Sequence, residues 1–132
     1  MASETFIRFV TGRHPSPHGH RTGLFQEAYR LWHEDTLPVA DRADLRVLLD
    51  WFNDNLEQPQ RLAPSPQVHA GKAAILWLRA SAHHHLAQLH RLVELVKKAR
   101  IAVDELQTIR PGYIVYRDAY QVIALPFADT PQ

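Results

Sequence analysis

The spacing of apolar residues in the first half of the chain predicts one strand followed by two amphipathic helices. Residues 5–10 (TFIRFV) form an almost continuous apolar run of strand-favouring residues, which predicts a buried strand. Thr22 is the expected cap of a first helix that ends by residues 37–38, and Asp41 is the expected cap of a second. Apolar stripes mark the two helices: Leu24, Phe25, Ala28, Leu31 and Trp32 on the first, and Leu45, Leu48, Leu49, Phe52 and Leu56 on the second.

The longest apolar repeat lies in the second half of the chain and predicts a long amphipathic helix within residues 71–100. Its members alternate spacings of three and four: Ile75, Leu78, Ala82, His85, Leu89, Leu92, Val96 and Ala99. Ser81 is able to cap a new helix, so the pattern leaves open whether this region holds one helix or two.

The last third of the chain changes to a strand pattern. Residues 101–109 predict a strand with irregular or edge character, and residues 113–117 and 120–125 predict two strands around a tight turn. Pro111 and Gly112 have the signature of a type II turn. We expect these three strands to form an antiparallel meander. The first strand is expected to join them, because its apolar character requires cover on both faces.

These elements predict a single α+β domain over residues 1–132, in the order β-α-α-α-β-β-β. We expect a small, mainly antiparallel sheet with the helices packed on one face, and flexible loops at about 11–23 and 58–70. The absence of cysteine excludes disulfides, thiolate metal ligands and cysteine nucleophiles. The chain has no signal-peptide core and no apolar run of ~18 residues, so we expect a cytoplasmic protein without a membrane segment.

Charge is nearly balanced overall but unevenly distributed along the chain. The net charge is +1. Residues 27–59 carry eight acids and three arginines, whereas residues 72–100 carry six basic residues and one acid. Two interpretations stay open, since one charged surface could steer a partner, or the acidic helices could pair with the basic one internally.

Histidine is abundant, with nine residues, and it suits metal binding and proton transfer near neutral pH. His83, His84 and His85 are successive in a predicted helix, where side chains are ~100° apart, so they cannot share one metal ion. His85 falls in the apolar stripe, so we expect a core histidine with one internal hydrogen bond. We expect no metal site and no cofactor.

A second group of basic residues lies in the predicted loop at 13–21: Arg13, His14, His18, His20 and Arg21. No acid occurs between Glu4 and Glu27, and the loop connects a strand to a helix start, where anions commonly bind. The glycine spacing does not match a phosphate-binding loop, and a metal site on His18 and His20 would need a third ligand from elsewhere. A solvated loop without a ligand is the simpler interpretation.

The predicted hairpin carries aromatic and hydrogen-bonding side chains, Tyr113, Tyr116, Arg117 and Gln121. Sheet packing explains such residues in most strands, but tyrosine and arginine are also favoured at protein interfaces. Residues 110–122 follow the pattern R-P-G-x-x-x-Y-x-D-x-Y-Q-V, and with residues 51–53 (WFN) and 77–79 (WLR) they resemble a group of small bacterial proteins. The resemblance spans most of the chain, but it rests on turn and strand residues and implies no activity.

We therefore expect a small non-enzymatic binding module, acting on a protein partner in a regulatory or inhibitor-like role, with no catalytic residues. One alternative is binding of nucleic acid or a phosphate ligand through residues 13–21, on a surface that could extend to Arg91, Lys97, Lys98 and Arg100. Another is a small enzyme that uses a loop histidine as general base. A homodimer is left open, because the long apolar stripe can be buried within one chain or between two.

Overall fold

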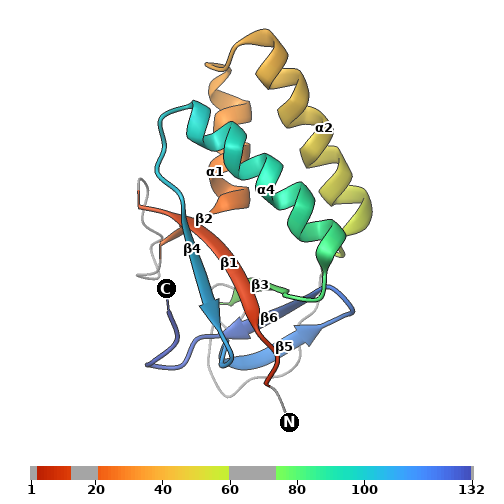
Figure 1. Ribbon diagram of the computed structural model, residues 1–132, viewed down its shortest axis with the longest axis vertical. Helices are drawn as coiled ribbons and strands as arrows, with labels where there is room; N and C mark the ends of the chain where they lie inside the picture. The colour runs from red at the N-terminus through yellow and green to blue at the C-terminus, as the bar shows by residue number, and fades with distance from the viewer. Residues whose placement is uncertain (1–2, 13–20, 60–73, 132) are drawn as a thin grey trace.

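The computed structural model describes residues 3–12, 21–59 and 74–131 as helices packed against a curled antiparallel sheet (Figure 1). In chain order the elements are β1 (Phe6–Thr11), β2 (Thr22–Gly23), α1 (Leu24–Glu34), α2 (Val39–Asn55), β3 (Ile75–Arg79), α4 (His83–Lys98), β4 (Asp104–Thr108), β5 (Tyr113–Arg117) and β6 (Gln121–Leu125). The predicted α+β class with a mainly antiparallel sheet is confirmed.

Strand β1 lies inside the sheet and has neighbours along both edges. β4 pairs with one edge, from Phe6 opposite Thr108 to Val10 opposite Asp104. The other edge is shared by β3, which pairs at residues 6–7, and by β2, which pairs at residues 10–11. Beyond β3 the order continues through β6 to β5, and every pair is antiparallel.

The predicted C-terminal meander is correct only for its last two strands. β5 and β6 form the expected hairpin, with Tyr113 opposite Leu125 and Arg117 opposite Val122. β4 pairs with β1 instead of β5, so the expectation of three consecutive paired strands is wrong. The side chains of β4 are mostly exposed, which suits a polar strand at the edge of a sheet.

Residues 75–79 form strand β3, so the prediction of a helix within 71–100 is wrong for its first part. Ile75 and Trp77 are buried on one face of the sheet, at 3% and 0% exposure, while Leu76 and Leu78 pack in the core on the other face. A strand buried on both faces is a continuous apolar run, and its spacings of three match a helical repeat by coincidence. The helix begins only at His83, so the break near Ser81 separates a strand from a helix.

The first two helices begin beside the residues that the sequence indicated. Thr22 belongs to β2, and Gly23 occupies the N-cap of α1. Pro38 precedes α2, which leaves Asp41 in the first turn of that helix. The apolar stripes of both helices pack into one core cluster with the core-facing side of the sheet, so these stripes are confirmed.

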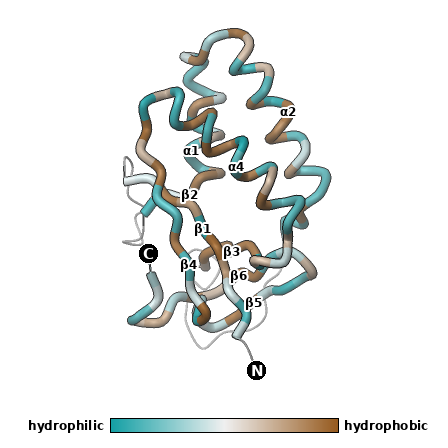
Figure 2. The backbone as a smooth tube through the Cα atoms, in the orientation of Figure 1, coloured by the Kyte–Doolittle hydropathy of each residue, from teal (hydrophilic) through white to brown (hydrophobic). Residues whose placement is uncertain are grey.

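Two hydrophobic clusters lie on opposite faces of the sheet. The larger fills the space between the sheet and the three described helices. The smaller contains Phe6, Ile75, Trp77 and Val122. Figure 2 shows the hydrophobic residues of β1, β3 and β6 gathered where these strands lie side by side. Alternate side chains of the central strands therefore supply both clusters.

Candidate ligand-binding site

Four of the five residues of the predicted basic loop lie outside the described residues: Arg13, His14, His18 and His20. The fifth, Arg21, immediately precedes β2, and its Nη2 lies 2.6 Å from Oδ2 of Asp104 in β4. The Arg21 carbonyl oxygen accepts a hydrogen bond of 2.8 Å from Nη2 of Arg8. The described end of the predicted site thus lies beside Arg8, which is not among the site residues predicted from the sequence.

The four predicted hairpin residues have different environments. Tyr113 is 44% exposed and Arg117 is exposed, whereas Tyr116 is half-buried. Gln121 is completely buried, and its Nε2 donates hydrogen bonds to the Glu57 carbonyl oxygen and to Asp118. The structure therefore does not place all four on one surface, since Gln121 connects β6 to the segment that follows α2.

Asp118 organises the turn of this hairpin. Its Oδ1 accepts hydrogen bonds from the backbone N–H groups of Tyr120 and Gln121, and its Oδ2 accepts from the Tyr116 hydroxyl and the Gln121 side chain. Partial burial acts to raise the pKa of Asp118, but these hydrogen bonds outweigh it and lower the pKa below its ordinary value. Burial and the neighbouring Asp118 carboxylate raise the pKa of Tyr116. Tyr116 and Gln121 are thus partners of a structural carboxylate.

Replacing Asp118 by asparagine is expected to reduce the free energy of unfolding at pH 7 by about 1 kcal/mol, because charge-assisted hydrogen bonds are lost. A carboxylate whose pKa is lower in the folded state than in the unfolded state stabilises the fold. This contribution is fully present at a pH above the unfolded-state pKa of about 3.9, and it is lost as the pH falls through the folded-state pKa. The difference between wild type and Asp118→Asn should therefore shrink as the pH is lowered from 7 to 2. Urea denaturation across this range measures it, with the exposed Asp50→Asn as control; a constant difference contradicts the prediction.

His85 is a core histidine, as the sequence predicted. It is 5% exposed, its Nε2 lies 2.7 Å from the Asn55 carbonyl oxygen, and its ring stacks on Tyr120 with centroids 4.2 Å apart. Because a carbonyl oxygen only accepts, Nε2 is the donor in this contact. His83 and His84 are exposed, so the three successive histidines diverge as expected.

Opposite charges on α2 and α4 meet where Lys98 Nζ lies 3.1 Å from Asp41 Oδ1.

Over the described parts of the chain, no three His, Asp or Glu side chains come together in a way that could hold a metal ion. Within those same parts, none of the helices has the length and apolar character needed to cross a membrane.

A cavity of about 260 Å³ lies where β3 separates from β1. The two strands pair only at residues 6–7, opposite residues 78–79. The same register would place Phe9 opposite Leu76, but these two residues are not paired and instead line the cavity. β2 pairs with this edge of β1 only at residues 10–11, so among the described strands none pairs with Arg8 and Phe9 on this side.

The wall of the cavity is mainly apolar. Its side chains come from both strands and from two helices: Ile7, Phe9, Leu24, Phe25, Ala74, Ile75, Leu76, Leu78 and Leu89. Among the described lining residues, only Arg8 and Gln26 carry polar side chains. An apolar cavity with a few converging polar groups is the usual form of a small-molecule site.

Arg8 is the charged group of this cavity. It is only 7% exposed, and while its Nη2 is bonded to Arg21, its Nη1 is buried without a hydrogen-bond partner. Burial, together with the charge of Arg21, lowers the pKa of Arg8 to about 10. The guanidinium thus stays charged at neutral pH, and a buried charge without a paired anion is unfavourable.

The first turn of α1 forms the part of the wall next to Arg8. Gly23, at the N-cap, has no side chain that could accept from the N–H groups of this turn. The residues that carry those groups, Leu24, Phe25 and Gln26, all line the cavity. Oε1 of Gln26 accepts a long hydrogen bond of 3.4 Å from the Gly23 N–H. A Cβ at Gly23 would lie 3.9 Å from Nη2 of Arg8, so the positive end of the helix dipole is close to the buried guanidinium.

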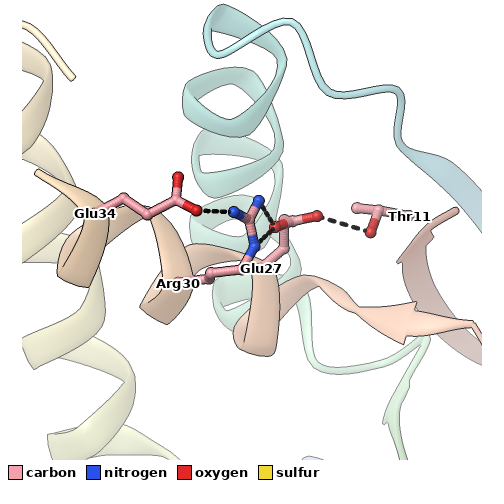
Figure 3. Close-up of polar contacts among 4 residues, drawn as sticks. All are labelled: Thr11, Glu27, Arg30 and Glu34. Carbon is pink, nitrogen blue, oxygen red and sulfur yellow. Dashed lines mark hydrogen bonds and ion pairs between the residues drawn. The ribbon is translucent and has the colours of Figure 1, made fainter. Parts of the chain in front are cut away.

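A buried carboxylate fixes α1 to the end of β1 (Figure 3). The side chain of Glu27 is 0% exposed, and its Oε1 accepts a hydrogen bond of 3.0 Å from the Thr11 hydroxyl. Its Oε2 pairs with Arg30, which also pairs with Glu34. Thr11 is the last residue of β1 and Glu27 lies in the first turn of α1, so this contact positions the helix end that borders the cavity.

One signal in the sequence pointed to Arg8. It is the only charged residue in the apolar run at 5–10 (TFIRFV). Arginine is rarely buried unless it is paired, so a charged residue inside a predicted buried strand marks a position that needs a partner. The cavity beside it had no such signal, because it results from the separation of two strands that are distant in the sequence.

Comparisons with known proteins identified no relative: no protein-family model matches the chain, and neither does any curated protein or solved structure.

Proposed function

We propose that the protein binds a small organic molecule with a mainly apolar body in the cavity between β1 and β3, and that it acts by binding and not by catalysis. The observation that carries this proposal is the mainly apolar cavity at the edge of β1, whose lining includes Arg8 with an Nη1 that lacks a hydrogen-bond partner. Apolar surface brought out of water stabilises a complex by roughly 25 cal/mol per Å², so such walls favour an apolar ligand.

The composition of the wall supports binding over reaction chemistry. Among the described lining residues, the polar side chains are a guanidinium and a carboxamide. Neither serves readily as a nucleophile or a general base near neutral pH. Arg8 is instead suited to holding and orienting a ligand, because it lines the cavity and its Nη1 donor has no hydrogen-bond partner.

Binding of a protein partner, in a regulatory or inhibitor-like role, is a second proposal and involves another surface. Tyr113 and Arg117 are exposed on β5, the last strand of the sheet order. Tyrosine and arginine are favoured at interfaces. The hypotheses of nucleic-acid binding and of a loop histidine as general base depend on residues 13–20, outside the described residues, and stay predictions.

Titration with the neutral probes toluene and 1-octanol, followed by amide NMR, tests the proposed function. We expect saturable shifts of amides in residues 7–9 and 23–26, which line the cavity. Ala74→Phe, which adds a ring at the wall, should weaken binding by about tenfold or more. Ala43→Phe makes the same substitution at an exposed position of α2 and should leave binding unchanged.

Two results would overturn the proposal. One is the absence of saturable shifts with either probe in a folded protein. The other is equal binding by the Ala74→Phe and Ala43→Phe variants, because it would place the bound probes outside the cavity.

A further inference from the structure

We infer that the ligand of this cavity carries a single carboxylate, held between the free Nη1 of Arg8 and the first turn of α1, on an apolar body. This inference rests on the proposed function and names the class of ligand. It follows from the charge, the donors and the size of the site.

The charge of the site requires an anion. Arg8 is 7% exposed, and in the part of the chain that the structure describes it forms no ion pair with a carboxylate. Arg21 lies next to it and disfavours the charged guanidinium. A bound anion would offset both the desolvation of Arg8 and this repulsion, so the site is poised for a negatively charged group.

The donors of the site come from two neighbouring elements, since a Cβ at Gly23, the N-cap of α1, would lie 3.9 Å from Nη2 of Arg8. Nη1 of Arg8 is buried and unpartnered, and Nη2 is already bonded to the Arg21 carbonyl oxygen. Gly23, the N-cap of α1, supplies no capping side chain to the N–H groups of the first turn, and this helix has 11 residues. A helix N-terminus beside a buried, unpartnered arginine donor is a suitable site for an anionic group.

The number of donors favours a carboxylate over a phosphate. One guanidinium nitrogen and a few N–H groups match the two oxygens and single charge of a carboxylate. A phosphate monoester carries about −1.5 to −2 charge and three acceptor oxygens, which call for further cationic groups. Arg8 is the single cationic side chain among the described residues that line the cavity, and the rest of the wall is mainly apolar.

The volume of the cavity sets the size of the apolar body. A buried apolar cavity of about 150 Å³ accommodates benzene. By proportion, a cavity of about 260 Å³ accommodates a ligand of roughly ten non-hydrogen atoms. Octanoate, with eight carbons and two oxygens, is therefore a suitable probe, and an aryl carboxylate of similar size fits the same description.

Isothermal titration at pH 7 with four eight-carbon probes tests the inference: octanoate, 1-octanol, octylamine and octyl phosphate, each below its micelle concentration. We expect octanoate to bind about 10 to 100 times more tightly than 1-octanol, because it adds charge-assisted hydrogen bonds. Arg8→Met keeps a long apolar side chain and removes the charge. We expect this variant to retain 1-octanol binding but to lose the preference for octanoate, while Ala43→Phe retains both.

The outcomes separate this inference from the proposed function. If octanoate binds no better than 1-octanol, the inference of a carboxylate head group is wrong, while the proposed binding of an apolar molecule in the cavity is still supported. If octyl phosphate or octylamine binds most tightly of the four, the inference of a carboxylate is wrong and the site prefers another head group. An Arg8→Met variant that keeps the full preference for octanoate shows that the head group lies elsewhere. If none of the four probes binds, both the carboxylate and the proposed function fail.

Discussion

Replacing Gly112 by alanine is expected to lower the free energy of unfolding by about 3 kcal/mol or more. Gly112 has a φ of +130°, which residues with a Cβ rarely adopt. A Cβ here would lie 1.9 Å from the Leu125 carbonyl oxygen, and this backbone atom cannot rotate away. Strained backbone costs of order 1–3 kcal/mol, and forced displacement in a packed region adds about 1–3 kcal/mol. Urea denaturation followed by tryptophan fluorescence measures the loss.

Gly12→Ala is the matched control for this substitution. A Cβ at Gly12 would meet its nearest neighbour, Nη2 of Arg21, at 3.8 Å, an ordinary contact. We expect this variant to change the free energy of unfolding by less than about 1 kcal/mol. Equal urea midpoints for the two variants would show that the β5–β6 hairpin does not require glycine at 112. The backbone seen at Gly112 would then not be that of the folded protein in solution.

The sequence predicted correctly those features that depend on a local period or a local turn. The helical stripe from Leu45 to Leu56 is buried because its spacing follows one face of α2. The same logic placed His85 inside the core, since it shares a face of α4 with Leu89. The hairpin of β5 and β6 was visible because two strand patterns flank a turn of a few residues.

The errors arise where structure depends on contacts between distant segments. β3 lies between β1 and β6, so it is buried on both faces and loses the alternation that would identify a strand. β4 pairs with β1 although the paired positions are 94 to 102 residues apart in the sequence, from Val10 opposite Asp104 to Phe6 opposite Thr108. No local pattern specifies either neighbour. Both errors affect the candidate site, because the cavity lies beside β1 at the point where the pairing between β1 and β3 ends.

The candidate site was predictable only in part. The sequence directed attention to the basic segment at 13–21, of which Arg21 accepts a hydrogen bond from Arg8 through its carbonyl oxygen. The residue that gives the site its charge, Arg8, lies within the preceding strand. A charge inside an apolar run is visible in a sequence, but whether it is exposed, paired or unpartnered depends on what packs around it. Here its surroundings are set by β2, α1 and β3.

Replacing Glu27 by alanine is expected to lower the free energy of unfolding by about 3 kcal/mol. Glu27 is completely buried, and its removal leaves the buried Thr11 hydroxyl without its acceptor and Arg30 without its inner partner. Breaking a buried ion pair by removing one member costs about 3–5 kcal/mol. The low end applies here, because the Arg30 side chain is 23% exposed and reaches water. Urea denaturation at pH 7 measures the change.

Two further variants distinguish the buried carboxylate from the rest of this cluster. Glu34 pairs with the same Arg30 but its side chain is 40% exposed, so Glu34→Ala should cost less than about 1 kcal/mol. Glu27→Gln keeps the shape and an acceptor for Thr11 but removes the charge, so its cost should fall between the other two. If Glu27→Ala is no more harmful than Glu34→Ala, the Thr11–Glu27 contact does not hold α1 on β1. The first turn of α1 would then have to be positioned at the cavity by apolar packing alone.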